Sequence, residues 1–137
     1  MDTFQDVLDF IQPEQVGRYW FRGQSLTPQF RIFGGQVLAQ CLMAAGQTVS
    51  EEMVAHSMHA YFLRAGDPES PVEFEVDPIR NGRSFATRRV VARQHEQAIF
   101  NTSISYQVME QGLSHSVDMP DVEAVAFKAD REFDGNG

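Results

Sequence analysis

The sequence predicts an α+β domain in which a long antiparallel sheet wraps around a single buried helix. Residues 36–45 are good helix formers and are apolar on nearly every side, which is typical of a helix surrounded by protein. Later segments alternate apolar and polar residues, as strands with one covered face do. The length of 137 residues suits one such domain with a core of its own.

The N-terminal part predicts two short elements. Apolar residues at positions 4, 7, 8 and 11 have the spacing of an amphipathic helix, which should end before Pro13. A brief strand is expected at Tyr19–Arg22.

The central helix is the most informative segment. Gly34 and Gly35 precede it and Gly46 follows it, so glycines mark both of its ends. Its residues leave little that is polar on either side, so we expect it to be buried all round. Its expected apolar face consists of Val37, Leu38, Cys41, Leu42 and Ala45.

The rest of the chain predicts a meander of antiparallel strands. The expected strands are residues 56–63, 72–77, 84–94 and 100–108. Asn81-Gly82 predicts a hairpin, because both residues tolerate positive φ. One buried helix followed by such a meander is the hot-dog architecture, and we assign it to residues 1–120. Residues 121–137 are acidic and without a clear period, and they predict a disordered tail.

Composition excludes several classes of protein. The formal net charge of −8 argues against a nucleic-acid binder, because phosphate contacts need a basic surface. No apolar run reaches the length of a membrane span, and the acidic N-terminus argues against secretion. Cys41 is the one cysteine, so neither an intrachain disulfide nor a cysteine-based zinc site is expected. A reducing cytoplasm is the expected location, and no cofactor or metal is expected.

Five arginines crowd one short stretch of this acidic chain. They are Arg80, Arg83, Arg88, Arg89 and Arg93. The planar guanidinium fork suits phosphate oxygens, so the group could hold a small anionic ligand. The alternative is a strand with solvated outward charges.

Four blocks of residues, in order, resemble the N-terminal half of the type II acyl-CoA thioesterases. These blocks are Phe33-Gly34-Gly35-Gln36, His56 to Asp67, Arg80 to Val90, and Ile99-Phe100 leading to Ser105-Tyr106-Gln107. The resemblance covers roughly residues 4–120. It implies a double hot-dog enzyme that hydrolyses acyl-CoA to a free fatty acid and coenzyme A. The arginine group would fit the phosphates of coenzyme A, with Arg80, Arg83 and Arg88 as the expected contacts.

In that family the acting Asp, the Ser or Thr, and the Gln belong mainly to the second half. The resemblance places Gln107 at the counterpart of the glutamine and Ser57 near that of the hydroxyl residue. The acid has no counterpart here, because the central helix contains neither Asp nor Glu.

Thioester hydrolysis needs a positioned water and donors for the developing oxyanion. Backbone N–H groups at Gly34, Gly35 and Gln36 could be those donors, because the first N–H groups of a helix lack an internal partner; the alternative is that the glycines merely allow tight entry of a buried helix. Gln107 could orient a water but is too weakly basic to deprotonate it, and it could equally be a solvated strand residue.

His59 is a candidate base, although a histidine packed in the sheet is the more common case. His56 and His59 are three residues apart on a strand, so they should point to opposite faces. Cys41, among apolar neighbours, should be inert.

The leading hypothesis is therefore acyl-CoA hydrolysis, by a homodimer or by one half of a double hot-dog enzyme. The alternative is a non-catalytic acyl-CoA-binding or subunit domain, which the helix without an acid favours. A hot-dog hydratase or dehydratase ranks low, because such an enzyme would need an Asp or Glu paired with a histidine near the helix, and no such acid is found.

Overall fold

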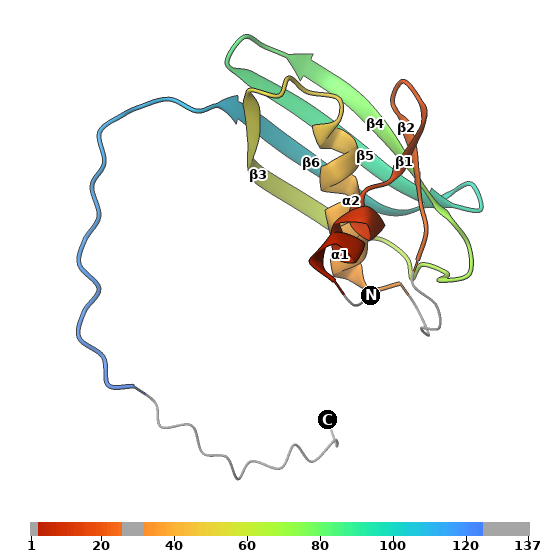
Figure 1. The fold of residues 1–137 in the computed structure, drawn as a ribbon, viewed down its shortest axis with the longest axis horizontal. Coiled ribbons are helices and arrows are strands. Elements are labelled where there is room, and N and C mark those ends of the chain that lie inside the picture. Colours follow the sequence, from red (N-terminus) through yellow and green to blue (C-terminus); the bar gives the residue numbers. More distant parts are fainter. Residues whose placement is uncertain (1–2, 26–31, 125–137) are drawn as a thin grey trace.

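The computed structural model describes residues 3–25 and 32–124 of the chain. In these ranges two helices and six strands follow one another (Figure 1). They are α1 (Phe4–Ile11), β1 (Glu14–Gly17), β2 (Trp20–Gly23), α2 (Gly34–Gly46), β3 (Met53–Phe62), β4 (Val72–Asn81), β5 (Phe85–Gln94) and β6 (Gln97–Val108). The expected helices and long strands are confirmed, whereas β1 was not foreseen.

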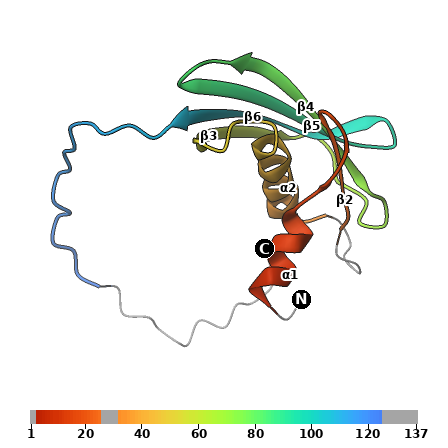
Figure 2. The same ribbon diagram turned by 45° about the horizontal axis from the view of Figure 1, so that its top comes forward.

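The six strands form one antiparallel sheet in the order β1-β2-β4-β5-β6-β3. The predicted meander is correct for β4, β5 and β6 but wrong for β3. Strand β3 comes first among the long strands in sequence, yet it pairs with β6 at the far edge of the sheet. Between β3 and β4 the chain therefore passes from this edge of the sheet back to β4, beside the β5–β6 turn. Helix α2 lies in the curve of the sheet (Figures 1 and 2). This is the hot-dog arrangement.

The alternation of the strands sets which face meets α2. Val72, Phe74 and Val76 of β4 are at most 2% exposed, while the glutamates between them are half-buried. On β6, residues 100, 102, 104 and 106 are buried in the same way. We call the face that meets α2 the inner face and the opposite one the outer face. Since the side-chain period of a strand is two, one register fixes the face of every strand residue.

Burial of α2 is incomplete, in contrast to the prediction. Val37, Cys41, Ala44 and Ala45 are buried against the sheet. Leu42 is 36% exposed, and Leu38 and Met43 are only partly buried. Helix α1 lies against part of α2, and Leu42 is the large apolar side chain of α2 that the described residues leave exposed.

Helix α1 is short and is fixed by local polar contacts. Its N-terminus has a capping box, in which Asp6 N–H donates to the Thr3 hydroxyl and Thr3 N–H donates to the Asp6 carboxylate. At its other end, the Phe10 carbonyl accepts a hydrogen bond from Gln40 Nε2 of α2 at 3.2 Å. The buried amide of Gln40 thereby attaches α1 to the central helix.

The turns differ from the prediction in one respect. The Asn81-Gly82 segment does connect β4 to β5, but neither residue has positive φ. Positive φ occurs instead at His95 and Glu96, at 50° and 66°, in the tight turn between β5 and β6. Both turns close hairpins, and in the β5–β6 turn the left-handed backbone conformation is adopted by two residues other than glycine.

The segment after β6 has no helix or strand as far as residue 124. Most of the predicted tail, residues 121–137, lies outside the described residues. No described helix has the length and apolar character needed to cross a bilayer.

Candidate functional site

A cavity of about 640 Å³ opens beside the N-terminus of α2. Ile32, Phe33 and Val37 line it on the helix side, and Phe62, Leu63 and Ile99 line it on the sheet side. Its size is in the range of small-molecule sites, and most of its lining residues are apolar. Arg64 is the single charged residue of the lining. We call this the α2 cavity.

The start of α2 lies directly at this cavity. Gly34 is part of the lining, and a Cβ atom added to it would meet Phe62 Cε1 at 2.7 Å. Phe33 at the N-cap offers no side-chain acceptor to the first turn. The N–H of Gln36 already donates to the Phe33 carbonyl at 3.1 Å, so the predicted donor role is left to Gly34 and Gly35. The Gln36 side chain is buried and donates to Ser25 and to the Gln24 carbonyl.

The three predicted catalytic side chains lie on the outer face of the sheet. Gln107 alternates with the buried Tyr106, whose hydroxyl is 3.5 Å from the Leu42 carbonyl of α2. Ser57 pairs with Ser105 and His59 pairs with Ser103, so both share the outer face with Gln107. The predicted backbone donors Gly34 and Gly35 belong to the helix on the inner face. Within one domain these two sets do not form a single site.

Distance along the sheet separates them as well. Gly34 touches the end of β3 at Phe62, which pairs with Phe100, whereas Gln107 is seven residues further along β6. At about 3.3 Å per residue this is about 23 Å. The apolar α2 cavity and the glutamine therefore occupy opposite ends and opposite faces of the sheet.

A β-bulge in β3 overturns the prediction for the two histidines. The register shifts between Ala55 and Ser57, and His56 is the extra residue. His56 Nε2 lies 2.8 Å from Ser105 Oγ, and its ring packs edge-on against Phe85 at 6.0 Å. His56 and His59 thus share the outer face. The sequence gives no signal for this bulge, and the contact between His56 and Ser105 was missed for that reason.

The predicted phosphate-binding arginines separate into two groups. Arg80 and Arg83 are exposed near the β4–β5 turn, where contact with coenzyme A remains a prediction. Arg88 is 2% exposed on the inner face, and burial lowers the pKa of its guanidinium. Its five N–H groups donate to five acceptors at 2.6–3.1 Å. The acceptors are Thr48 Oγ1, the carbonyls of Thr48, Arg80 and Thr87, and Asn81 Oδ1.

No donor of Arg88 remains for a phosphate. Its bonds instead attach the segment after α2, at Thr48, to the β4–β5 hairpin. In this arrangement Arg88 is part of the packing, and the structure offers no support for the predicted ligand contact.

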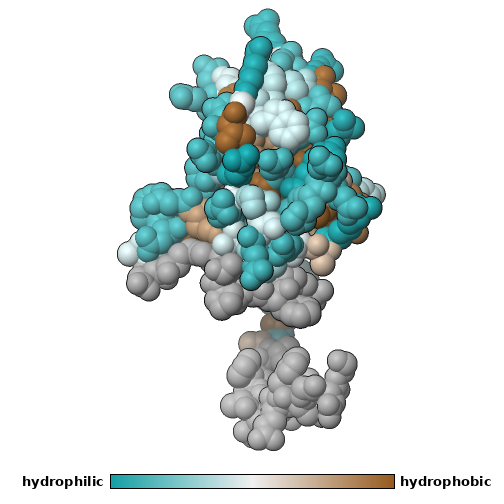
Figure 3. All heavy atoms as spheres, turned by 90° about the vertical axis from the view of Figure 1, so that its right-hand side faces the viewer, coloured by the Kyte–Doolittle hydropathy of each residue, from teal (hydrophilic) through white to brown (hydrophobic). Residues whose placement is uncertain are grey.

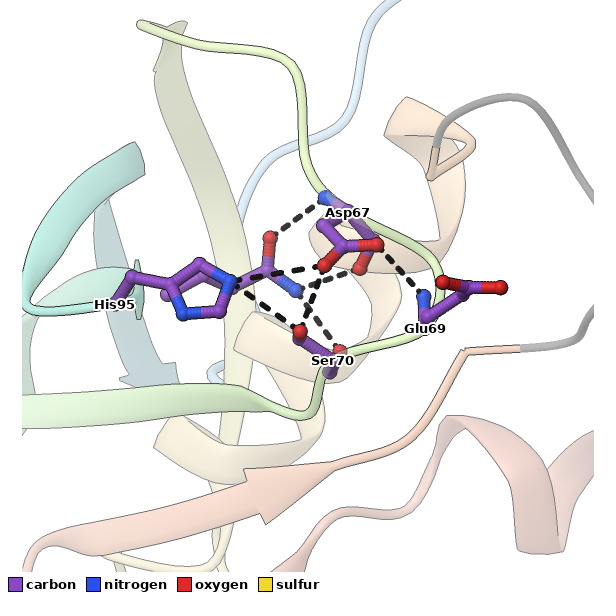
Figure 4. Close-up of polar contacts among 5 residues, drawn as sticks. Asp67, Glu69, Ser70 and His95 are labelled. Atoms are coloured by element: carbon purple, nitrogen blue, oxygen red, sulfur yellow. Dashed lines mark hydrogen bonds and ion pairs between the residues drawn. The ribbon is translucent and has the colours of Figure 1, made fainter.

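A polar cluster joins the turn after β3 to the β5–β6 turn (Figure 4). Ser70 Oγ donates to Asp67 Oδ2 at 2.7 Å, and His95 Nε2 lies 3.2 Å from Ser70 Oγ and 3.6 Å from Asp67 Oδ2. The buried amide of Gln94 completes the cluster with three bonds to the backbone of Asp67 and Ser70. Hydrogen bonds from the Ser70 hydroxyl and the Glu69 N–H, with a smaller effect of His95, lower the pKa of Asp67.

This cluster has the residue types of a hydrolase triad but not its geometry. In a triad one ring nitrogen faces the serine and the other faces the acid. Here Nε2 of His95 faces both, and the serine hydroxyl donates to the carboxylate directly. The cluster therefore holds two turns together and does not activate a nucleophile.

Cys41 lies fully buried in the core, and burial raises the pKa of its thiol. Since the thiolate is the reactive form, a buried thiol that stays protonated should be unreactive, as predicted for Cys41.

The six-stranded antiparallel sheet curved around α2 places the chain among hot-dog domains. Residues 23–107 match the model of the acyl-CoA thioesterase N-terminal domain. The chain belongs to this family.

Similar proteins support the assignment. The chain is 40% identical over 124 residues to acyl-CoA thioesterase 2 of Haemophilus influenzae, covering 90% of this chain and 43% of that protein. It is 50% identical over 113 residues to acyl-coenzyme A thioesterase 8 of Mus musculus, covering 82% and 35%. A solved structure, the tesB protein of Mycobacterium avium subs paratuberculosis, superposes with a TM-score of 0.77 at 39% identity, covering 90% and 49%. The chain thus spans less than half the length of each of these three proteins.

Proposed function

We propose that this chain is one hot-dog half of an acyl-CoA thioesterase, which hydrolyses acyl-CoA to a fatty acid and coenzyme A once it is paired with a second half. The observation that supports this most is the family match over residues 23–107, together with an apolar cavity at the start of α2. We keep the reducing cytoplasm as its expected compartment, which suits a chain with one buried thiol.

The edge strand β3 is the surface we propose for pairing. It is ten residues long and ends the sheet, so its outer backbone groups have no strand partner in the described part of the chain. Tyr61 and Phe62 at its end are 61% and 62% exposed. The side of the molecule that Figure 3 shows is largely hydrophilic, although β1 and β2 at the opposite edge expose Val16 and Trp20 in part. A second hot-dog unit added along β3 would also cover the exposed side of α2, including Leu42.

Pairing also answers a chemical need. Helix α2 contains no acid, and the groups predicted for catalysis lie on the face away from it. A water near the α2 cavity would therefore need its base from another unit. Both pairing schemes, with a second half or with a second copy of this chain, remain within the proposal.

The test is thiol release from a series of acyl-CoAs by the chain alone and by the chain mixed with a purified second half of a type II thioesterase. Gln107→Ala is compared with Gln97→Ala, which changes an exposed glutamine at the other end of the same strand. We expect turnover only in the paired state. Absence of turnover in every paired mixture, for every acyl-CoA, would refute the proposal.

A second candidate is a non-catalytic acyl-CoA-binding or subunit domain. The α2 helix without an acid favours it. Tight binding of an acyl-CoA by calorimetry, with no turnover in any paired state, would select this candidate over the first.

A further inference from the structure

The α2 cavity combines an apolar interior with one cationic group. Its lining includes Val37, Phe62, Ile99 and Phe100, and the last two are at most 6% exposed. Arg64 is exposed and donates through Nη1 to the Ala98 carbonyl at 2.7 Å. No carboxylate of the described residues lies within ion-pair distance of Arg64. In a chain with a net charge of −8, an arginine without an acidic partner at the rim of a cavity is suited to an anion.

A second positive feature lies at the same cavity. Helix α2 begins at Gly34, which lines the cavity, and its N-cap residue supplies no side-chain acceptor. The N-terminus of a helix carries partial positive charge and open N–H donors, and both favour a carboxylate. Arg64 and the helix start therefore favour the same kind of ligand group.

Hydrogen bonds within the chain hold the wall of the cavity in its shape. The N–H groups of Leu63 and Arg64 both donate to the Ile99 carbonyl, and the Ile32 N–H donates to the Gly66 carbonyl. Just beyond the wall, the three bonds of Gln94 hold the turn from Asp67 to Ser70 (Figure 4). Such preorganisation lowers the entropic cost of binding.

From these features we infer that the α2 cavity binds an unesterified fatty acid tail-first, with its carboxylate on Arg64 and the start of α2. This inference rests on the proposed function and names a ligand of the same cavity, because the fatty acid is the product of the proposed hydrolysis. The thioester group of an acyl-CoA is uncharged, so it would leave Arg64 without an anion at the rim. A carboxylate at the end of an apolar chain supplies both the tail and the charge in one small molecule.

The test is isothermal titration calorimetry on the full 137-residue chain with three probes. Dodecanoate carries the tail and the carboxylate, dodecanol carries the tail alone, and dodecanoyl-CoA carries the thioester. We expect dodecanoate to bind more tightly than dodecanol, because only dodecanoate pairs with the guanidinium.

Two variants and one control locate the site. Arg64→Gln should weaken the binding of dodecanoate by about 10-fold or more, since a hydrogen bond to a charged group contributes about 1.5–3 kcal/mol. The affinity for dodecanol should not change. Ala65→Trp should abolish the binding of dodecanoate and of dodecanol, because an indole at this exposed lining position fills the cavity. Arg89→Gln, an exposed arginine on the outer face paired with Asp77, should leave both unchanged. Leu63→Trp replaces Ala65→Trp if circular dichroism shows that the latter is unfolded.

Three results would overturn the inference: no binding of dodecanoate, equal binding in Arg64→Gln, or unchanged binding in the variant that fills the cavity. Tighter binding of dodecanoyl-CoA with the same dependence on Arg64 would also overturn it, by showing that the thioester is the occupant. None of these results depends on turnover, so thiol release in the paired enzyme tests the proposed function separately.

Discussion

Arg88 offers the sharpest test of how this fold is held together. The perturbation is Arg88→Met, which keeps much of the length of the side chain and removes the guanidinium. In the folded protein the guanidinium satisfies five acceptors on the segment after α2 and on the β4–β5 hairpin, and no described carboxylate neutralises its charge. The variant therefore measures how much the hydrogen bonds between the buried guanidinium and its neutral acceptors contribute to the free energy of unfolding.

The magnitude follows from two opposing terms. Hydrogen bonds to a charged donor contribute about 1.5–3 kcal/mol each, so the five bonds are large in sum. Burial of an ion costs several kcal/mol, and this cost disappears in the methionine variant. The acceptors left behind are only partly reached by water, because Thr48 is half-buried while Asn81 is exposed. We expect a net loss of about 3 kcal/mol in the free energy of unfolding, or about 10 °C in Tm.

Urea denaturation followed by circular dichroism measures this loss. Arg89→Met, at the next position but on the outer face and 56% exposed, is the matched control and should change stability by less than about 0.5 kcal/mol. Arg88→Lys should also destabilise, since a single ammonium cannot reach five acceptors on two segments. If Arg88→Met matched the control within error, the argument that this network fastens α2 to the hairpin would be refuted.

Four further predictions follow from local contacts. The pKa of Asp67 is lowered in the folded protein, so its cluster contributes stability above the ordinary aspartate pKa, and this stability is lost as pH falls through the pKa of the folded state. The wild type should therefore lose more stability in acid than Asp67→Asn does. Equal losses in the two proteins would contradict this. Burial raises the pKa of Tyr106 to about 12 and also raises that of Cys41. Because the unfolded chain loses these protons first, stability should decline as pH rises from about 8.5–10 towards 12. A free energy of unfolding that stays constant over this range would argue against burial of these groups. The Cys41 thiol should react with a disulfide reagent only as fast as the domain opens, so fast labelling in native buffer would show a different packing. Thr3→Ala should destabilise α1 by about 1 kcal/mol, visible as faster amide exchange in this helix alone.

Sequence determined the local elements and the faces of most strands. The bounds of α1 follow from its apolar spacing, and the inward set of β6 follows from strict alternation, because both depend on neighbours along the chain. The family resemblance could also be stated from four ordered blocks of residues, since motif order survives without coordinates.

Tertiary structure decided the features that depend on residues distant in sequence. The pairing of β3 with β6 is a long-range choice, and the bulge at His56 exists only in that pairing. The burial of Arg88 could not be read from a cluster of arginines, because its acceptors come from Thr48 and from the neighbouring hairpin. The α2 cavity likewise forms only when the fold brings together Ile32, Phe62 and Ile99. These residues are far apart in sequence, and no local pattern predicts that they meet.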